Sequence, residues 1–424
     1  MQIDKFFEIL RKYNFWDGED TYPGVLRSDY LPRISEYLGN RLVKVITGQR
    51  RTGKSYLIRQ IIIHLHRQGT NPANILYINR EIADFDFIRD QKDLHNIVKL
   101  YLTRLKPEGR VFLFFDEIQL VSNWEQLINS YSQDYTEEFE VFVSGSNSSL
   151  LSGEMASLLS GRYITFQVFS YSFKEYCRAN ALKASKKSFL EYLKGGGMPE
   201  LSHLKTEEIK QHYLSDLKNT IVLRDIIMRH KVKDIGLLDL LFAFIVQNIS
   251  NPVSINNIVN YLGSINITTN FNTISSYIEY LKQTFVIWEV PRYDMRGKKI
   301  LGGTRKYYLN DLSFRNYLYP GFEPGLGYLL ENAVFLEFKR NGYEIFTGSY
   351  RNREVDFVIK KGEILKYAQV TYMLTNEKVV EREFNNLVKI RDNYDKMVIS
   401  LDDVSLGNYK GIKHYPAWQD GIFS

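Results

Sequence analysis

The segment GQRRTGKS, residues 48–55, has the residue types and the spacing needed to hold a phosphate group. It fits the pattern G-x-x-x-x-G-K-[ST] without departure. In this pattern backbone N–H groups curl around phosphate oxygens, and the positive end of the following helix adds to the attraction. The lysine reaches the β- and γ-phosphates, and the last hydroxyl binds Mg²⁺. The sequence therefore predicts a nucleotide site made of consecutive residues: Gly48, Gln49, Arg50, Arg51, Thr52, Gly53, Lys54 and Ser55.

A pair of carboxylates, Asp116 and Glu117, follows the apolar run Val111–Phe115. The run predicts a buried strand, so the carboxylates stand at its end. We expect Asp116 to hold Mg²⁺ through its water shell. Glu117 is then the candidate general base, which must lie within hydrogen-bond reach of the attacking water. The alternative is an acidic helix cap after a core strand, and the phosphate loop upstream favours the catalytic interpretation.

A third polar group follows the apolar run Val141–Val143, in the sequence Ser144-Gly145-Ser146-Asn147. A polar side chain at the end of this strand is placed to contact the γ-phosphate or the water that attacks it. We count Asn147 among the catalytic residues, and Ser146 stays open as the alternative. A plain turn without a role in catalysis is the remaining interpretation.

The elements that must position these residues alternate between short apolar runs and helix-length stretches, which predicts βαβ units and a parallel sheet. The phosphate loop falls between the first strand and the first helix, and the carboxylates end the third strand. A glycine run at residues 195–197 is expected to end this block. The expected strands are Leu42–Thr47, Ile75–Asn79, Val111–Asp116, Val141–Gly145 and Ile164–Val168, with helices over Lys54–Gln68 and Lys92–Lys106.

The rest of the chain divides into three blocks, of which the first, residues 205–235, is charged and helical in pattern. The second contains two short helices, Ser254–Leu262 capped by Ser254 and Thr273–Gln283 capped by Asn272. Strands at Phe285–Val290 and Lys306–Leu309 follow, which gives the element order of a winged helix. The last block begins with a helix at Tyr328–Arg340 and continues with strands at Glu344–Thr347, Val355–Ile359 and Tyr367–Tyr372.

Four segments, GQRRTGKS, FLFFDEIQ, VSGSNSSLL and LSGRYITFQVFSYSFKEY, resemble the AAA+ domain of a bacterial and archaeal family of ATPases. In that family a winged helix and a domain of unknown function with a restriction-endonuclease-like core follow the ATPase domain. The resemblance implies an α/β P-loop NTPase fold of the AAA+/ASCE type at residues 1–204 and a helical lid at 205–235. It further implies a winged helix at 236–315 and a degenerate restriction-endonuclease-like α/β domain at 316–424.

The resemblance also implies ligands and residue roles. The ligands are ATP and Mg²⁺. Arg162 lies where such a protein carries an arginine that completes the ATP site, and a planar guanidinium suits developing phosphate charge. A surface salt bridge is the alternative for Arg162, and Arg224 is a second candidate. The matched motifs are Lys54 and Ser55 as the Walker A pair, Asp116 and Glu117 as the Walker B pair, and Ser146 or Asn147 as sensor 1.

The expected winged helix suggests contact with double-stranded DNA, because such a domain places its second helix in the major groove. That helix, TISSYIEYLKQ, has one lysine and no arginine. It therefore offers few side chains for sequence-specific contact with bases. A docked protein is the alternative partner for this module. The turn and strand after the helix carry basic side chains suited to phosphates, namely Arg296, Lys298, Lys299, Arg305 and Lys306.

The last block departs from the pattern of a restriction-endonuclease-like site, which has a helix Glu, a strand Asp and a Glu-x-Lys on the next strand. The third position reads Gln369-Val370-Thr371, so one carboxylate and the lysine are missing. An amide is a weaker ligand than a carboxylate for a hard cation. We therefore expect the fold to survive without cleavage. The candidate residues are Glu331, Glu337 and Asp356, with Glu363 and Lys366 as neighbours that could take over the missing roles.

The composition excludes several classes of protein. The chain has 424 residues, of which 25% are charged and 44% hydrophobic, as in folded proteins of several domains. A net charge of +6 does not by itself argue for nucleic acid, and one cysteine excludes a disulfide framework or a Cys-based zinc site. No apolar run approaches the ~20 residues of a membrane span. We expect a cytoplasmic protein without a membrane partner.

The interpretation that unites these features is an ATP-hydrolysing switch whose turnover rearranges the winged-helix and C-terminal modules. Three alternatives stay open: a nucleotide-gated protein-interaction module with little turnover, an ATP-regulated nuclease, and a motor on DNA. The first block has no N-K-x-D pattern for reading guanine, which favours ATP over GTP. The sequence leaves the oligomeric state open.

Overall fold

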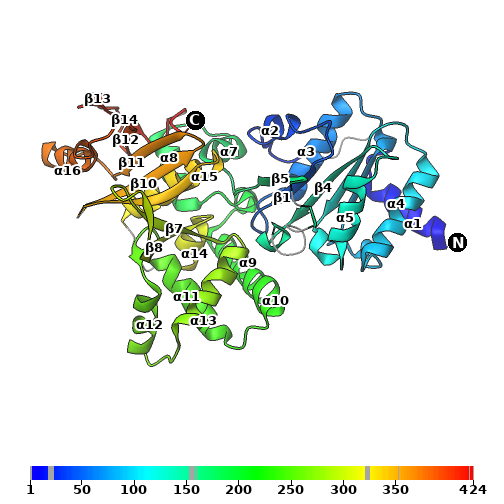
Figure 1. The fold of residues 1–424 in the computed structure, drawn as a ribbon, viewed down its shortest axis with the longest axis horizontal. Coiled ribbons are helices and arrows are strands. Elements are labelled where there is room, and N and C mark those ends of the chain that lie inside the picture. The colour runs from blue at the N-terminus through cyan, green and yellow to red at the C-terminus, as the bar shows by residue number, and fades with distance from the viewer. Residues whose placement is uncertain are drawn as a thin grey trace. The chain divides into compact units, whose positions relative to one another are not determined.

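The computed structural model describes residues 2–17, 23–151, 158–159, 161–319, 325–351, 353–419 and 421–423. The chain divides into two compact units, residues 1–168 and residues 169–424, both drawn in Figure 1. The division into four domains made from the sequence stays a prediction.

The first unit is built on a sheet of five parallel strands. Three of them, β1, β3 and β4, are buried along their full length. Helices cover both faces of a parallel sheet, which explains why these strands are apolar runs rather than alternating ones. The expected strands agree with the observed ones to within two residues at either end. In sheet order the strands are β2 (Ile75–Asn79), β3 (Val111–Asp116), β4 (Phe139–Gly145), β1 (Val43–Thr47) and β5 (Tyr163–Gln167).

Two sets of helices pack against this sheet. Leu10 of α1, Leu94 of α4 and Leu127 of α5 share one apolar core with the sheet. Ile34 of α2 and Leu57 of α3 belong to a second core on other strand residues. The phosphate-loop helix therefore lies with α2, and the other helices form a separate layer (Figure 1). The bounds are α1 (Gln2–Tyr13), α2 (Leu31–Ser35), α3 (Lys54–Arg67), α4 (Gln91–Leu105) and α5 (Trp124–Gln133).

The second unit begins with helices, and the helical pattern expected over residues 205–235 is confirmed. The glycine run expected to end the first block is instead a tightly packed turn inside this unit. A Cβ on Gly196 would lie 2.3 Å from Asp311 Oδ1, and one on Gly197 would lie 2.4 Å from Tyr171 O. The helices are α7 (Phe173–Ala179), α8 (Lys186–Gly195), α9 (Glu207–Thr220), α10 (Met228–His230) and α11 (Ile235–Gln247), with a π-helical turn at Ile221–Ile227.

The next elements are β6 (Pro252–Val253), α12 (Ile255–Ser264), α13 (Phe271–Gln283), β7 (Ile287–Asp294) and β8 (Lys299–Leu309). Ser254 caps α12 as predicted, since its side chain accepts a hydrogen bond from Asn257 N. The predicted cap of α13 is wrong: Asn270 has the extended backbone of a cap and accepts from Thr273 N, whereas residue 272 is already helical. The hairpin is longer than expected because β8 begins at Lys299 rather than Lys306.

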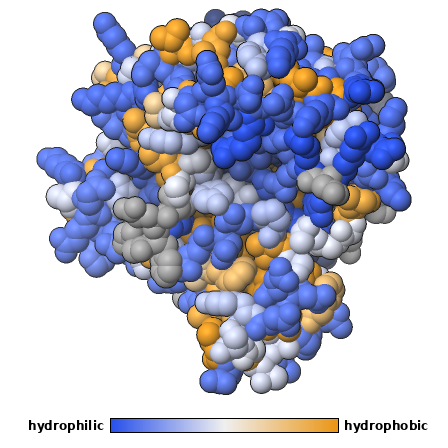
Figure 2. All heavy atoms as spheres, turned by 90° about the vertical axis from the view of Figure 1, so that its left-hand side faces the viewer, coloured by the Kyte–Doolittle hydropathy of each residue, from blue (hydrophilic) through white to orange (hydrophobic). Residues whose placement is uncertain are grey.

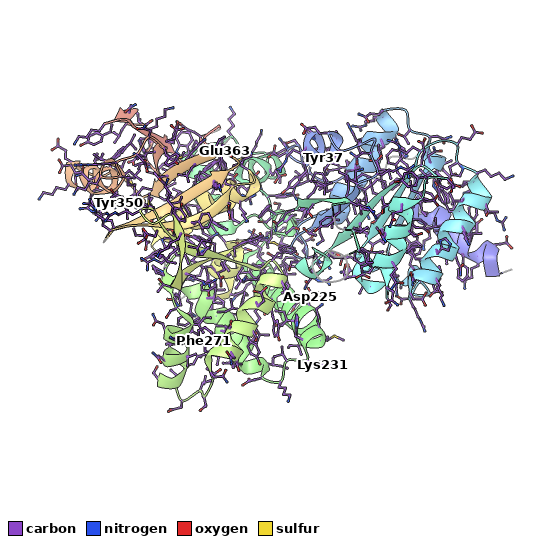
Figure 3. The ribbon with its side chains drawn as sticks, in the orientation of Figure 1. Tyr37, Asp225, Lys231, Phe271, Tyr350 and Glu363 are labelled. Atoms are coloured by element: carbon purple, nitrogen blue, oxygen red, sulfur yellow. The ribbon has the colours of Figure 1, made fainter. Side chains whose placement is uncertain are left out.

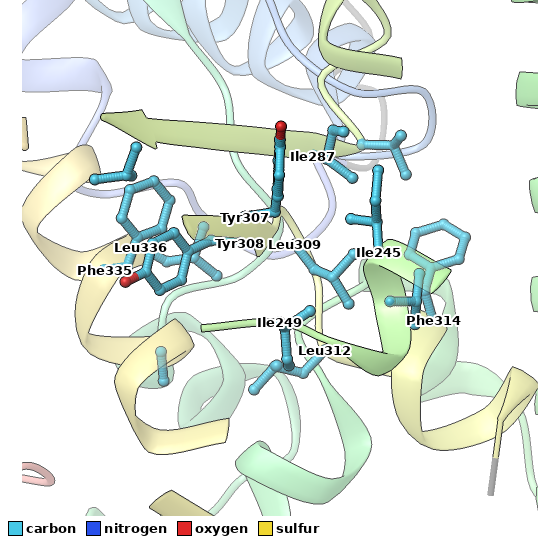
Figure 4. Packing of buried hydrophobic residues seen from close by; sticks show 14 of the residues in the cluster. Ile245, Ile249, Ile287, Tyr307, Tyr308, Leu309, Leu312, Phe314, Phe335 and Leu336 are labelled. Atoms are coloured by element: carbon cyan, nitrogen blue, oxygen red, sulfur yellow. The ribbon is translucent and has the colours of Figure 1, made fainter. Parts of the chain in front are cut away.

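A sheet of nine strands joins this hairpin to the C-terminal elements, because β7 pairs in parallel with β9. Tyr308 of β8 stacks on Phe335 of α15 in the core of this unit, with ring centroids 4.3 Å apart (Figure 4). The face drawn in Figure 2 is hydrophilic over most of its area, with smaller hydrophobic patches. The remaining elements are α14 (Ser313–Leu318), α15 (Leu326–Arg340), β9 (Glu344–Tyr350), β10 (Arg353–Lys361), β11 (Ile364–Val370), α16 (Glu377–Val388), β12 (Asp395–Ser400), β13 (Asn408–Tyr409) and β14 (Ile412–Pro416).

Candidate nucleotide site

The loop at residues 48–53 leaves the carboxyl end of β1 and enters α3 at Lys54. Gly48 has φ of +151°, and a Cβ there would lie 2.1 Å from Val168 O, so no side chain fits. Gly53 forms the N-cap of α3 with φ of +95°, a left-handed conformation that favours glycine. The motif therefore requires its two glycines for different reasons. At Gly48 the backbone of Val168 approaches too closely for a side chain, and at Gly53 the helix cap needs a left-handed backbone conformation. The helix N-terminus after them supplies N–H groups for an anion.

Lys54 is 4% exposed and bends back over the loop. Its ammonium donates to Gly48 O and to Gln49 O, both at 3.1 Å. Its Nζ also lies 3.8 Å from Glu117 Oε1. Burial lowers the pKa of Lys54, and the carboxylates of Glu117 and Asp116 oppose this shift. The lysine is therefore held at the concave side of the loop, next to the carboxylates that end β3.

Asp116 ends β3, and hydrogen-bond donors from the two neighbouring strands fix its carboxylate. Tyr77 Oη donates to Oδ2 at 3.0 Å and Asn79 Nδ2 donates to the same oxygen at 3.1 Å. Ser144 Oγ donates to Oδ1 from the other side. Because β2, β3 and β4 are parallel, their carboxyl ends meet at one edge of the sheet. The hydrogen bonds from β2 and β4 at this edge hold the carboxylate of Asp116 in one position.

Glu117 follows directly, with φ of +55°, which turns the chain sharply after the strand. Its backbone N–H donates to Ser144 Oγ at 3.2 Å. Its Oε2 accepts from Gln119 Nε2 at 2.5 Å and from Ser146 Oγ at 3.4 Å. Burial raises the pKa of Glu117, and Lys54 opposes this shift. A buried carboxylate with a raised pKa is better able to take a proton, as a general base requires.

The structure brings together most of the residues expected at this site. Ser55 lies in the first turn of α3, half-buried. Asn147 is 1% exposed and lies just beyond β4, while the adjacent Ser146 is the one whose hydroxyl contacts Glu117. The choice between Ser146 and Asn147 therefore stays a prediction, with the observed contact in favour of Ser146.

Arg162 is not brought to this edge. It precedes β5, whose first residue pairs with the first residue of β1, so it lies at the amino end of the strands, opposite the loop. Its side chain is exposed, with NH1 3.4 Å from Asn129 Oδ1. The geometry does not support a role for Arg162 in the ATP site of its own chain. The side chain of Arg224 lies outside the described residues.

Other residues support the loop without a prediction from the sequence. Arg27 is 2% exposed, and its NH1 donates to Thr52 O at 2.7 Å. Of the loop residues that the sequence does predict, Arg50 forms an ion pair with Glu81 at 2.6 Å, and Arg51 is exposed. The position of Asn79 at the end of an expected strand was a usable signal, because strand ends meet at one edge. No sequence pattern marks Arg27.

The side chains at this site could bind Mg²⁺ together with the phosphates of a nucleotide. They do not form a complete set of protein ligands for a cation. Ser55 and Asp116 offer a hydroxyl and a carboxylate, which are ligands that Mg²⁺ takes together with phosphate oxygens and water. Across the described residues, no group of three or more His, Cys, Asp or Glu side chains could hold a metal ion.

The basic residues expected to contact DNA separate into two groups. Arg296, Lys298 and Lys299 are exposed at the turn of the hairpin. Arg305 instead forms an ion pair with Glu289, and Lys306 is 3% exposed and bound to carboxylates. The expectation that Lys306 contacts phosphate is therefore wrong, because its side chain points into the protein.

The acidic residues expected to form a nuclease-like site in the last block do not all lie together. Glu331 lies near Asp356, since both contact Lys306, whereas Glu337 forms an ion pair with Arg340 at 2.7 Å. Glu363 lies at the turn between β10 and β11 (Figure 3), the opposite end of the hairpin from Asp356. Lys366 Nζ lies 3.4 Å from Tyr343 Oη. Neither Glu363 nor Lys366 takes over the missing nuclease role.

Sequence comparisons identify related proteins that extend over most of the chain. A family profile described as "AAA domain" matches residues 40–177, and a domain of unknown function matches residues 186–324. An uncharacterised protein of Haemophilus influenzae is 32% identical over 380 residues, which is 89% of this chain and 93% of the relative. An uncharacterised protein of Methanocaldococcus jannaschii is 32% identical over 381 residues, 86% of this chain and 81% of the relative.

Two solved structures are distantly similar to this chain. A Walker-type ATPase of Pyrococcus abyssi matches with 16% identity and a TM-score of 0.39, covering 70% of this chain and 99% of that one. The Orc1 protein of Aeropyrum pernix, solved in complex with DNA, matches with 15% identity and a TM-score of 0.34, covering 73% and 97%. No described helix is long and apolar enough to cross a membrane.

Proposed function

Because the chain belongs to the family of AAA-domain proteins that includes the Haemophilus influenzae and Methanocaldococcus jannaschii relatives, we propose that it binds ATP with Mg²⁺ and hydrolyses it. One observation carries the proposal. Lys54, at the start of α3, and Glu117, just after β3, have charged atoms 3.8 Å apart. A phosphate-binding lysine and a buried carboxylate at this distance are the two groups that phosphoryl transfer to water requires.

Each residue has a role that follows from its position. The loop at residues 48–53 and the N-terminus of α3 hold the phosphates, and Lys54 stabilises charge on the β- and γ-phosphates. Glu117 orients the water and accepts its proton. Ser55 and Asp116 would hold Mg²⁺, which neutralises the charge on phosphate oxygens when bound. Ser146 and Asn147 remain the candidates for contact with the γ-phosphate.

Phosphate release from Mg-ATP tests this proposal. We expect Glu117→Gln to retain ATP binding and to lower turnover by about 100-fold or more, the usual contribution of a general base. We expect Lys54→Ala to lose binding as well. Turnover that is unchanged in Glu117→Gln would contradict the assigned base. Tight ATP binding with no phosphate release by the wild type would favour the nucleotide-gated interaction module instead.

We also propose that residues 236–315 form a winged helix whose hairpin contacts DNA phosphates. The element order is helix, strand, two helices and hairpin, and β8 pairs with both β6 and β7. Arg296, Lys298 and Lys299 are exposed at the hairpin turn. Each phosphate contact adds about 0.9 to the slope of log affinity against log salt. The triple change to Gln should flatten that slope for a DNA duplex in a fluorescence anisotropy titration, and an unchanged slope would favour a protein partner.

A further inference from the structure

The side chain of Lys306 lies inside a group of three carboxylates contributed by two elements, helix α15 and strand β10. Its Nζ is 2.9 Å from Glu331 Oε1 on α15, 2.8 Å from Glu354 Oε1 on β10 and 3.7 Å from Asp356 Oδ1 on the same strand. Lys306 is 3% exposed. Tyr308, two residues along the same strand, donates its hydroxyl proton to Glu331 Oε1 at 2.7 Å. Side chains two apart on a strand share a face, so β8 presents both donors to one carboxylate.

Glu331 and Asp356 are the residues that match the helix Glu and the strand Asp expected of a nuclease-like site. In such a site the carboxylates surround a divalent cation. Here the centre of the same carboxylates is taken by an ammonium that belongs to the chain. We propose that Lys306 replaces the divalent cation among Glu331, Glu354 and Asp356, so that this site is closed to metal and does not cleave phosphodiesters.

The chemistry of an ammonium explains why the replacement removes the activity. Lys306 carries one positive charge and only donates hydrogen bonds, so it has no coordination position at which to bind and activate water. A single charge also neutralises three carboxylates only in part. Burial raises the pKa of Asp356 to about 8, and the pKa of Glu331 is raised for the same reason, so protons supply part of the missing charge. Burial would lower the pKa of Lys306, but the three carboxylates raise it overall and keep it charged.

Contacts with the neighbouring strand β11 are also consistent with a site that holds no metal ion. Asp356 Oδ2 accepts a hydrogen bond from Val370 N at 2.8 Å, so one of its oxygens is occupied by backbone. Gln369, which stands where a nuclease has its second acid, is 8% exposed, and its Oε1 accepts no hydrogen bond from the part of the chain that the structure describes. Glu354, Asp356 and Gln369 line a cavity of about 760 Å³. Space is therefore present beside the carboxylates, and what excludes metal is the lysine.

Binding of Mn²⁺ to the nucleotide-free full-length protein tests the proposal by calorimetry. We expect wild type and Asp356→Asn to bind the same number of Mn²⁺ ions, because no ion uses Asp356. Lys306→Met removes the ammonium at similar volume, and we expect it to bind one additional Mn²⁺. The added site should disappear in the double variant Lys306→Met/Asp356→Asn. Lys360→Met, at an exposed lysine of β10 that has no proposed role, is the matched control and should gain none.

The outcomes that overturn the proposal are distinct. If Asp356→Asn removes one Mn²⁺ from the wild-type count, then Lys306 stands beside a metal rather than in its place. If Lys306→Met folds and gains no Mn²⁺, the carboxylates do not form a cation position. Should Lys306→Met fail to fold, the numbers of Mn²⁺ ions bound by the wild type and by Asp356→Asn still test whether Asp356 binds metal. Cleavage of plasmid DNA by the wild type that depends on Mn²⁺ and on Asp356 would also overturn it.

Discussion

The side-chain amide of Gln119 donates a hydrogen bond to the carboxylate of Glu117, with Nε2 2.5 Å from Oε2. Gln119 lies in the 3-10 turn that follows Glu117, and Gly145 at the end of β4 leaves room for it. A Cβ on Gly145 would lie 2.4 Å from Gln119 Oε1 and 2.1 Å from Leu150 Cδ1. The orientation of the proposed general base thus depends on a glycine of the neighbouring strand.

We therefore predict that Gly145→Ala lowers kcat for ATP by about tenfold, because the new methyl group displaces Gln119 and with it Glu117. The affinity for ATP should change little, since the phosphate loop is not involved. Gln119→Ala should give a similar loss of kcat if the hydrogen bond is the cause. Steady-state kinetics with a separate ATP binding assay measures both quantities, and an unchanged kcat in both variants would contradict the positioning role.

Gly48→Ala should destabilise the first unit and abolish ATP binding. The added Cβ would overlap Val168 O at 2.1 Å, and φ of +151° is unfavourable for alanine. We expect a fall in Tm of several degrees by differential scanning fluorimetry. Gly263→Ala is the matched control, because a Cβ there meets nothing within 4 Å and the residue lies in helix α12. An equal fall in both variants would show that the loop does not require Gly48 specifically.

A buried ion pair in the first sheet predicts a large loss of stability when it is broken. Lys44 Nζ on β1 lies 2.6 Å from Glu140 Oε1 on β4, and both side chains are fully buried. Removing one partner leaves a buried charge, which costs about 3–5 kcal/mol. Urea unfolding should show this loss for Lys44→Met and for Glu140→Gln. The double variant Lys44→Met/Glu140→Gln should lose less than the two single losses added together, and strict additivity would contradict the pairing.

The raised pKa of Asp356 predicts a pH-dependent effect of its removal. Burial raises this pKa from 3.8 to about 8, with Glu331, Glu354 and Lys306 as the charged neighbours. The folded protein therefore binds this proton more tightly than the unfolded chain does. The stability from this proton is complete below about pH 4 and is lost as the pH rises through about 8. Asparagine cannot ionise, so the Tm of Asp356→Asn relative to wild type should rise between about pH 5 and about pH 9. The exposed Glu363→Gln serves as the control, and a flat difference for Asp356→Asn would contradict the burial of its charge.

The features of this protein that depend on local order along the chain can be read from its amino-acid sequence. The glycines and Lys54 of the phosphate loop, the buried runs that form β1, β3 and β4, and the carboxylates after β3 follow from residue types and spacing. Apolar runs of this length form strands covered on both faces, and the motif fixes its own loop. The cap of α12 at Ser254 was also local, since the side chain bonds only three residues ahead.

Contacts between residues far apart in the sequence depend on the three-dimensional fold. Strand order placed Tyr77, Asn79 and Ser144 around Asp116, and it placed Arg162 at the opposite edge from the loop. Lys306 looked like one of five basic residues of a hairpin, but pairing of β7 with β9 joined that hairpin to the C-terminal sheet. Its ammonium then met carboxylates of α15 and β10. Sequence spacing carries no information about such contacts, because the register between strands and the packing of helices on them set which side chains share a space.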